Sequence, residues 1–116
     1  MIAVVLVAVG GTAGVLTRYG LTVWIESIWT IAVINLAGSF LLGMLLHVGD
    51  GWSHEVRNGV GVGFLGGFTT LSTLTAQTVL EADGGRAGLA AAYFAVNVVG
   101  GLLAALAGYV LGKAIA

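Results

Sequence analysis

The sequence has no cysteine, no proline and very little charge. Of its 116 residues, 59% are hydrophobic and 8% are charged, and four Lys/Arg against five Asp/Glu give a formal net charge of −1. The missing cysteines exclude disulfides and sulfur-ligated metals, and the missing basic clusters exclude the charge pattern of a nucleic-acid-binding protein. So few charges cannot keep so apolar a surface in water, which excludes a soluble enzyme and a disordered module. The composition therefore predicts a membrane protein.

The charged residues divide the chain into four long apolar stretches. These cover about residues 2–24, 29–48, 58–80 and 87–112, and about 20 apolar residues are enough to cross the hydrocarbon core of a bilayer. Backbone groups in lipid must be paired internally, and unbroken apolar runs achieve this as helices rather than as barrel strands. We therefore expect one all-α, four-span membrane domain over residues 1–116, with no soluble domain and no cleaved leader.

Twenty glycines are the unusual part of the composition. Several recur at the small-xxx-small spacing that lets helix backbones approach closely, which predicts a packing role for most of them. These are the pairs Gly10/Gly14 and Gly108/Gly112 and the series Gly59/Gly63/Gly67.

The basic residues give no clear orientation in the membrane. Arg57 and Lys113 fall on one side of a four-span chain, while Arg86, with Arg18, falls on the other. Either lipid and other loop features decide the orientation, or the chain inserts both ways or pairs with an oppositely oriented partner. Four thin helices also leave little room for a shielded, water-lined path. We therefore expect an oligomer, with an antiparallel dimer as the natural consequence of weak orientation signals.

Polar residues inside the spans are the candidates for function, because intramembrane polar groups are expensive to keep. Asn35 and Ser39 share a face of the second span, and Tyr93 and Asn97 share a face of the fourth. The third span is the most polar, with the run GFLGGFTTLSTLTAQT from residue 63 to 78. Two glycines followed by two threonines disfavour a regular helix, so we expect a break in the middle of this span.

Such a break would expose backbone carbonyls, which are suitable ligands for Na⁺. The hydroxyls and amides are neutral donors that can replace the water around a small anion without trapping it. This combination favours passive anion conduction. The alternative is that the hydroxyls only bond to their own helix and to neighbouring helices. No Asp, Glu or His lies in the middle of a span, which disfavours a proton-coupled transporter, and no catalytic constellation is present, which disfavours an enzyme.

Taken together, these segments resemble the small fluoride channels of the Fluc, or CrcB, family. The resemblance spans the whole chain and is carried, in order, by GGTAGVLTRY (residues 10–19), INLAGSFLLG (34–43), GFLGGFTTLSTLTAQ (63–77) and VNVVGG (96–101). It implies an antiparallel, dual-topology dimer in the cell membrane, two pathways for passive export of cytoplasmic fluoride, and a central structural sodium ion.

The resemblance also implies roles for individual residues. The backbone carbonyls of Gly66 and Thr69 would hold the sodium ion, and Arg18 would be the basic residue of the vestibule, where an ordinary interfacial role is the alternative. The fluoride pathway would be lined by Asn35, Ser72, Thr73, Tyr93 and Asn97.

One departure from the family pattern concerns two aromatic positions. The family has Phe-Ser-Thr-Phe after the two threonines, whereas this chain has Leu71-Ser72-Thr73-Leu74. In the family these rings turn their electropositive edges toward fluoride, and leucine has no such edge. We therefore expect a subunit either of a heterodimer or of a homodimer whose pathway is lined by hydroxyls and aliphatic side chains. Two other functions stay open: a non-conducting partner subunit, and a four-span proton-coupled multidrug exporter, which would need a carboxylate inside a span.

Overall fold

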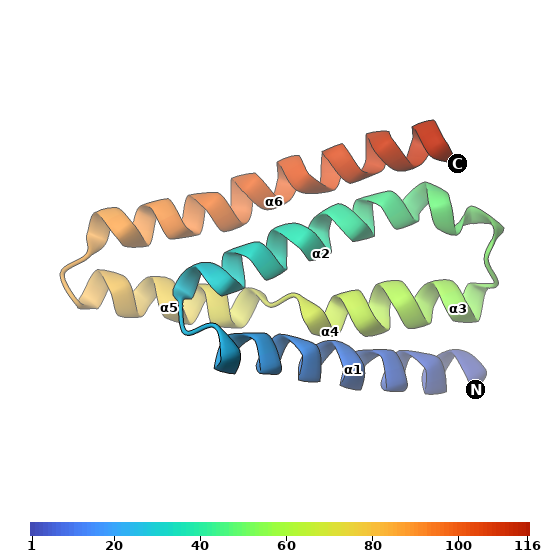
Figure 1. Cartoon of the computed structure of the whole chain (residues 1–116), viewed down its shortest axis with the longest axis horizontal. Coiled ribbons are helices and arrows are strands. Elements are labelled where there is room, and N and C mark those ends of the chain that lie inside the picture. The colour runs from blue at the N-terminus through green and yellow to red at the C-terminus, as the bar shows by residue number, and fades with distance from the viewer.

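All regular structure in the chain is helical (Figure 1). The computed structural model describes residues 1–116. Four helical segments are long and apolar enough to cross a membrane: α1 (Ile2–Trp24), α2 (Ile28–Val48), a composite third segment, and α6 (Ala87–Ile115). The prediction of an all-α chain with four helical segments able to span a membrane is confirmed.

The third segment is built from several pieces. It runs through α3 (His54–Asn58), the π-helix η2 (Gly59–Leu65), α4 (Gly66–Phe68) and α5 (Leu71–Asp83). Thr69 and Thr70, between α4 and α5, have extended backbone angles, with φ/ψ of −85°/159° and −151°/125°. Thr70 caps α5, because its side chain accepts a hydrogen bond from the Thr73 N–H at 3.2 Å. The two threonines thus separate two helical parts of the segment.

The third segment begins earlier than the hydropathy pattern indicates. The spans predicted over residues 29–48 and 58–80 leave residues 50–57 as a polar connection, but the second half of this stretch is the first turn of α3. Ser53 caps this turn by accepting a hydrogen bond from the Val56 N–H at 3.2 Å. Hydropathy cannot reveal this start, since the first turn of the helix is polar.

The four segments run alternately in opposite directions (Figure 1). Short connections join them at residues 25–27, at 49–53, which include the 3-10 helix η1 (Gly49–Gly51), and at 84–86. The most extensive pairings are α2 with α6 and α1 with η2. The start of α1 and the end of α6 lie at the same end of the bundle, as four crossings require.

Glycines allow both pairings to be close. A Cβ at Gly63 would lie 2.8 Å from the Val7 carbonyl oxygen of α1, and one at Gly67 would lie 2.6 Å from the Gly11 carbonyl oxygen. Between α2 and α6, a Cβ at Gly112 would lie 2.6 Å from the Met44 carbonyl oxygen. Real Cβ atoms do not approach so closely, so any side chain would separate the helices. The packing role predicted for the glycine series is confirmed at these positions.

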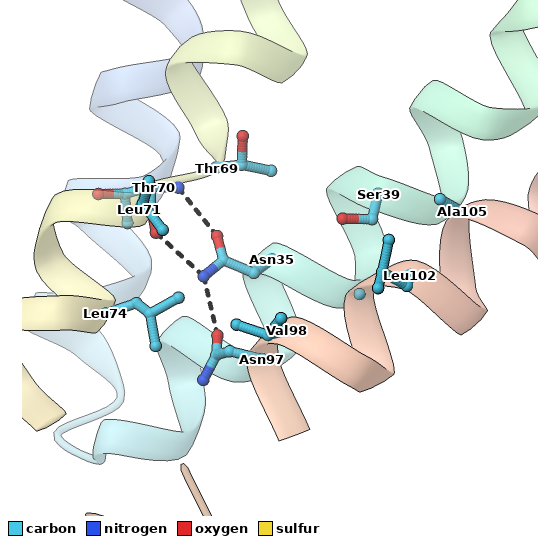
Figure 2. Close-up of a pocket in the computed structure, with 11 residues that line it drawn as sticks. Asn35, Ser39, Thr69, Thr70, Leu71, Leu74, Asn97, Val98, Leu102 and Ala105 are labelled. Atoms are coloured by element: carbon cyan, nitrogen blue, oxygen red, sulfur yellow. Dashed lines mark hydrogen bonds between the residues drawn. The ribbon is translucent and has the colours of Figure 1, made fainter. Parts of the chain in front are cut away.

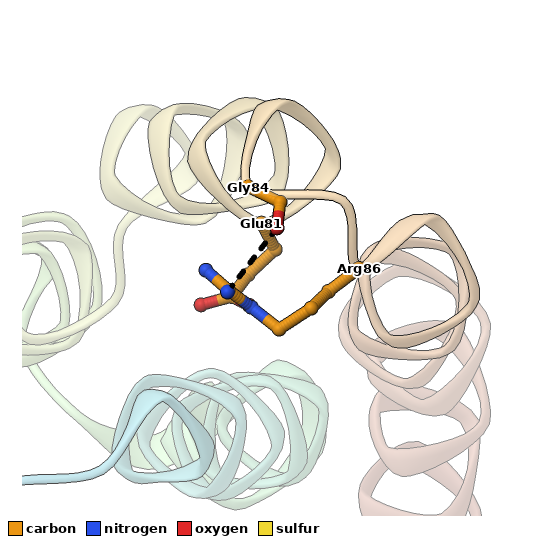
Figure 3. Close-up of polar contacts among 3 residues, drawn as sticks. All are labelled: Glu81, Gly84 and Arg86. Atoms are coloured by element: carbon orange, nitrogen blue, oxygen red, sulfur yellow. Dashed lines mark hydrogen bonds and ion pairs between the residues drawn. The ribbon is translucent and has the colours of Figure 1, made fainter.

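The turn between α5 and α6 is closed by an ion pair. The Arg86 guanidinium contacts the Glu81 carboxylate (Figure 3), and the Arg86 backbone N–H donates to the Glu81 carbonyl at 2.9 Å. Gly85 has a φ of +81°, a left-handed conformation that glycine adopts without steric penalty. These features hold α5 and α6 as an antiparallel hairpin.

Candidate functional site

A cavity of about 410 Å³ lies beside the extended threonine pair (Figure 2). Residues of α2, of the third segment and of α6 meet there, so three of the four helical segments contribute to it. It is lined by Asn35, Ser39, Thr69, Thr70, Leu71, Leu74, Asn97, Val98, Gly101, Leu102 and Ala105. We call this space the amide cavity, because its two asparagines are its largest polar side chains.

The two asparagines form a hydrogen-bonded relay with the backbone of Thr70 (Figure 2). Asn35 Oδ1 accepts from the Thr70 N–H at 2.8 Å, and Asn35 Nδ2 donates to the Thr70 carbonyl at 3.1 Å. The same Nδ2 donates to Asn97 Oδ1 at 2.8 Å, and Asn97 Nδ2 donates to the Tyr93 carbonyl at 2.9 Å. Both asparagines are less than 9% exposed, and buried amides are stable only when hydrogen-bonded in this way.

The relay changes which backbone carbonyls are occupied. In a continuous helix the Thr70 N–H would donate to the Gly66 carbonyl and the Thr73 N–H to the Thr69 carbonyl. Here those two N–H groups donate instead to Asn35 Oδ1 and to Thr70 Oγ1. The carbonyls of Gly66 and Thr69 are therefore released from their helical donors. Such hard oxygen donors suit a cation like sodium.

A second cavity, of about 670 Å³, lies on the α1 side of the threonine pair. Gly66, Thr69 and Ser72 line it together with Arg18, whose Nε donates to the Gly67 carbonyl at 3.2 Å. The Arg18 guanidinium thus supplies a hydrogen-bond donor to a backbone carbonyl near the end of α4. A positive charge is favourable there, because the C-terminal end of a helix carries partial negative charge. We call this space the arginine cavity.

The predicted site residues thus divide between two cavities. Asn35 and Asn97 line the amide cavity, whereas Arg18, Gly66 and Ser72 line the arginine cavity. Thr69 and Leu71 line both cavities. Within one chain, the polar residues of the two cavities therefore lie on the two sides of the extended Thr69–Thr70 segment.

Two predicted pathway residues line neither cavity. Thr73 accepts from the Thr70 hydroxyl at 3.1 Å, and the Tyr93 hydroxyl donates to Gln77 Oε1. Tyr93 is fully buried and packs edge-on against Trp29, with ring centroids 5.7 Å apart. In the single chain Thr73 belongs to the N-terminal cap of α5, whereas Tyr93 joins α6 to α5 and α2.

Gln77 is a polar residue that the sequence reasoning left outside the site. It belongs to the polar run of the third segment, but nothing in the sequence indicates that it meets Tyr93 of α6, 16 positions away. An amide in a mostly apolar helix is itself the available signal, because such a group needs a buried partner.

The two leucines at the altered aromatic positions have different surroundings. Leu74 is 4% exposed and belongs to the core cluster with Ile31, Ala32 and Tyr93. Leu71 is 70% exposed and lies at the edge of both cavities. Of these two leucines, only Leu71 is exposed in the single chain.

Comparisons with known proteins extend over nearly the whole chain. The family model described as "CrcB-like protein, Camphor Resistance (CrcB)" matches residues 5–109. A protein named fluoride-specific ion channel FluC from Thermus thermophilus is 41% identical, covering 95% of this chain and 93% of its own length. The protein of the same name from Pseudomonas fluorescens is also 41% identical, with 95% and 96% covered. FluC 1 of Bacillus anthracis is 35% identical, with 93% and 85% covered.

Proposed function

The chain belongs to the CrcB-like family, and from this premise we propose that it is a subunit of a passive fluoride channel in the cell membrane. The observation that carries the proposal is the amide cavity, whose polar lining consists of amides and hydroxyls without a charged side chain. Neutral donors replace the hydration shell of a small anion, yet they do not hold it as a fixed cation would.

We assign the polar lining of the pathway to Asn35, Ser72, Thr73, Tyr93 and Asn97. Arg18 serves as the vestibule cation, since its guanidinium lines the arginine cavity and favours the approach of an anion. Thr73 and Tyr93 line neither cavity of the single chain, so their part in the pathway rests on the family pattern.

The functional unit is an antiparallel dimer with a structural sodium ion where the third spans meet. The released carbonyls of Gly66 and Thr69 would hold this ion, because backbone carbonyls of an unwound membrane segment can coordinate Na⁺. A bound sodium ion supplies positive charge that offsets the carbonyl dipoles of the broken span. The exposed apolar surface of Leu71 supports a second subunit at the same place.

A partner subunit of a heterodimeric channel is the second candidate. It is favoured by Leu71 and Leu74, which replace the two aromatic residues of the family pattern. A proton-coupled exporter is disfavoured, because the five carboxylates lie in connections or near the ends of helical segments, as Glu26, Asp50, Glu55, Glu81 and Asp83.

Reconstitution in liposomes tests the proposal. Liposomes that contain the purified protein are loaded with fluoride. Efflux is then followed with a fluoride electrode while a protonophore collapses any proton gradient. We expect fluoride efflux that persists under these conditions and is absent for chloride. Efflux that appears only after a homologous subunit is added indicates the heterodimer. Proton-coupled movement of a cationic dye without fluoride efflux would overturn the proposal.

A further inference from the structure

An apolar groove lies between α2 and the third segment. Its volume is about 320 Å³, and every residue that lines it is hydrophobic. The lining residues are Leu41, Met44, Leu45 and Val48 of α2, Trp52, and Val60, Phe64 and Leu65 of η2. We call this space the apolar groove. None of its residues belongs to the proposed fluoride pathway or to the carbonyls proposed for sodium.

The apolar groove opens on the side of α2 that faces away from the amide cavity. Asn35 and Ser39 line the amide cavity, whereas the four α2 residues named above line the groove. At 3.6 residues per turn, the centres of these two sets lie roughly 150° apart around the helix. The antiparallel dimer proposed above has its second subunit at the polar cavities and at Leu71. The groove therefore faces lipid, and the inference rests on the proposed function in this one respect.

The groove has a length and a depth that suit one acyl chain. Leu41 and Val48 are separated by about 10 Å along α2, because a helix rises 1.5 Å per residue. The hydrocarbon core is about 30 Å thick, so one leaflet spans about 15 Å. Trp52 lies at the end of the groove next to η1, and tryptophan is typical of the membrane–water interface. At the deeper end lies Phe64, whose ring stacks on Phe68 with centroids 5.8 Å apart.

Arg57 stands at the interfacial end of the apolar groove. It precedes Val60 by three positions, so the two residues share a face of the third segment. A Cβ at Gly49 would lie 3.4 Å from Arg57 Cγ and Cδ and 2.9 Å from Leu45 Cδ1. The aliphatic part of Arg57 therefore lies close to the groove wall, and such a side chain keeps its charged end at the interface.

The Arg57 guanidinium keeps hydrogen-bonding capacity for an anionic group. Its Nη2 donates to the Leu46 carbonyl at 3.2 Å, which uses one of its five N–H groups. Its Nη1 lies 3.6 Å from Asp50 Oδ1, which is longer than a hydrogen bond, and the Asp50 side chain is 65% exposed. Exposed ion pairs of this kind contribute little. A phosphate at the membrane surface can thus pair with Arg57.

We propose that the apolar groove binds one phospholipid per chain, with an acyl chain along the groove wall and the phosphate at Arg57. The hydrophobic lining excludes a polar occupant, and a guanidinium pairs with phosphate through strong, charge-assisted hydrogen bonds. The acyl chain fills the space between α2 and η2, which pack together less extensively than α2 and α6. The bound lipid thereby joins the second and third spans on the face away from the polar cavities.

Native mass spectrometry of the full chain counts bound lipid directly. Protein in micelles is titrated with phosphatidylglycerol and, separately, with diacylglycerol of the same acyl chains, which lacks the phosphate. We expect one phosphatidylglycerol per chain at saturation, and binding of diacylglycerol weaker by at least about tenfold. Arg57→Gln should weaken phosphatidylglycerol binding by a similar factor and leave diacylglycerol binding unchanged. Equal binding of the two lipids to the unmodified chain would overturn the role of Arg57.

A matched pair of variants tests the groove itself. Val60 lines the groove, whereas Val62 of the same π-helix does not line it and is 64% exposed. Val60→Trp should fill the groove and weaken phosphatidylglycerol binding at least about tenfold, while Val62→Trp should keep it within about twofold. Unchanged binding in Val60→Trp, or equal weakening in both variants, would overturn the proposal.

Tryptophan fluorescence tests the occupant without altering the groove. Trp24→Phe and Trp29→Phe together leave Trp52 as the sole indole, and its quenching by phosphatidylglycerol with brominated acyl chains is measured in liposomes. We expect quenching that saturates at a low mole fraction of brominated lipid. Quenching in proportion to the mole fraction would indicate ordinary boundary lipid, and absence of quenching would indicate that a second subunit covers the groove; either result overturns the proposal. Fluoride takes no part in these measurements, so a chain without fluoride efflux refutes the proposed function and leaves the lipid site to be decided separately.

Discussion

Replacing Leu71 and Leu74 by phenylalanine should have different consequences, although the family pattern has an aromatic residue at both positions. Leu74 is 4% exposed against Ile31, Ala32 and Tyr93, and inserting a larger side chain into a packed core typically destabilises by about 1–3 kcal/mol. Leu71 is 70% exposed, and a surface substitution usually changes stability by less than about 0.5 kcal/mol. We expect Leu74→Phe to be the more destabilising variant by at least about 1 kcal/mol.

Thermal unfolding in one detergent at a fixed sodium concentration measures the difference. For a chain of this length 1 kcal/mol corresponds to a shift of about 3–6 °C in Tm, so Leu74→Phe should unfold several degrees below Leu71→Phe. Fluoride efflux provides the functional readout, and Leu71→Phe should increase it by adding a ring edge at the cavity. An equal loss of stability in both variants, or a larger loss in Leu71→Phe, would refute the packing argument.

Three further predictions follow from single contacts. Gly108→Ala should destabilise by about 1–3 kcal/mol, because a Cβ there overlaps the α2 backbone; Gly20→Ala, with no neighbour within 4 Å, should be neutral or stabilising in the same thermal assay. Asn35→Asp should lower fluoride efflux at least about tenfold, since it places a carboxylate on the path and removes both amide donors; undiminished efflux would separate Asn35 from conduction. Gly85→Ala should destabilise by about 1–2 kcal/mol because of its positive φ, whereas Gly88→Ala, in open space within α6, should not; equal melting temperatures would contradict this.

The sequence predicted the features that depend on local composition. The four membrane-crossing helices follow from apolar runs that charged residues separate, and each run needs only its own residues to form its backbone bonds. The close contacts of Gly63, Gly67 and Gly112 follow from glycine spacing along single helices. The start of α3 escaped prediction, because Ser53 and a polar first turn are invisible to hydropathy.

The details of the site could not be predicted, because they depend on pairs far apart in the chain. Asn35 meets the Thr70 backbone 35 positions away and Asn97 62 positions away. Polarity inside an apolar run marked these residues as functional, but only the packing of α2, α5 and α6 decides which donor meets which acceptor. The same holds for Tyr93, whose hydroxyl turns to Gln77 rather than to a cavity.

The four crossings leave the start of α1 and the end of α6 on one face of the membrane (Figure 1). In an antiparallel pair, the end of α6 in one copy and the start of α1 in the other are on opposite faces. A water-soluble tether cannot join them, however long it is. A tandem fusion with both copies in opposite orientations needs an odd number of additional crossings between them, and a fusion through a soluble tether forces both copies to insert the same way.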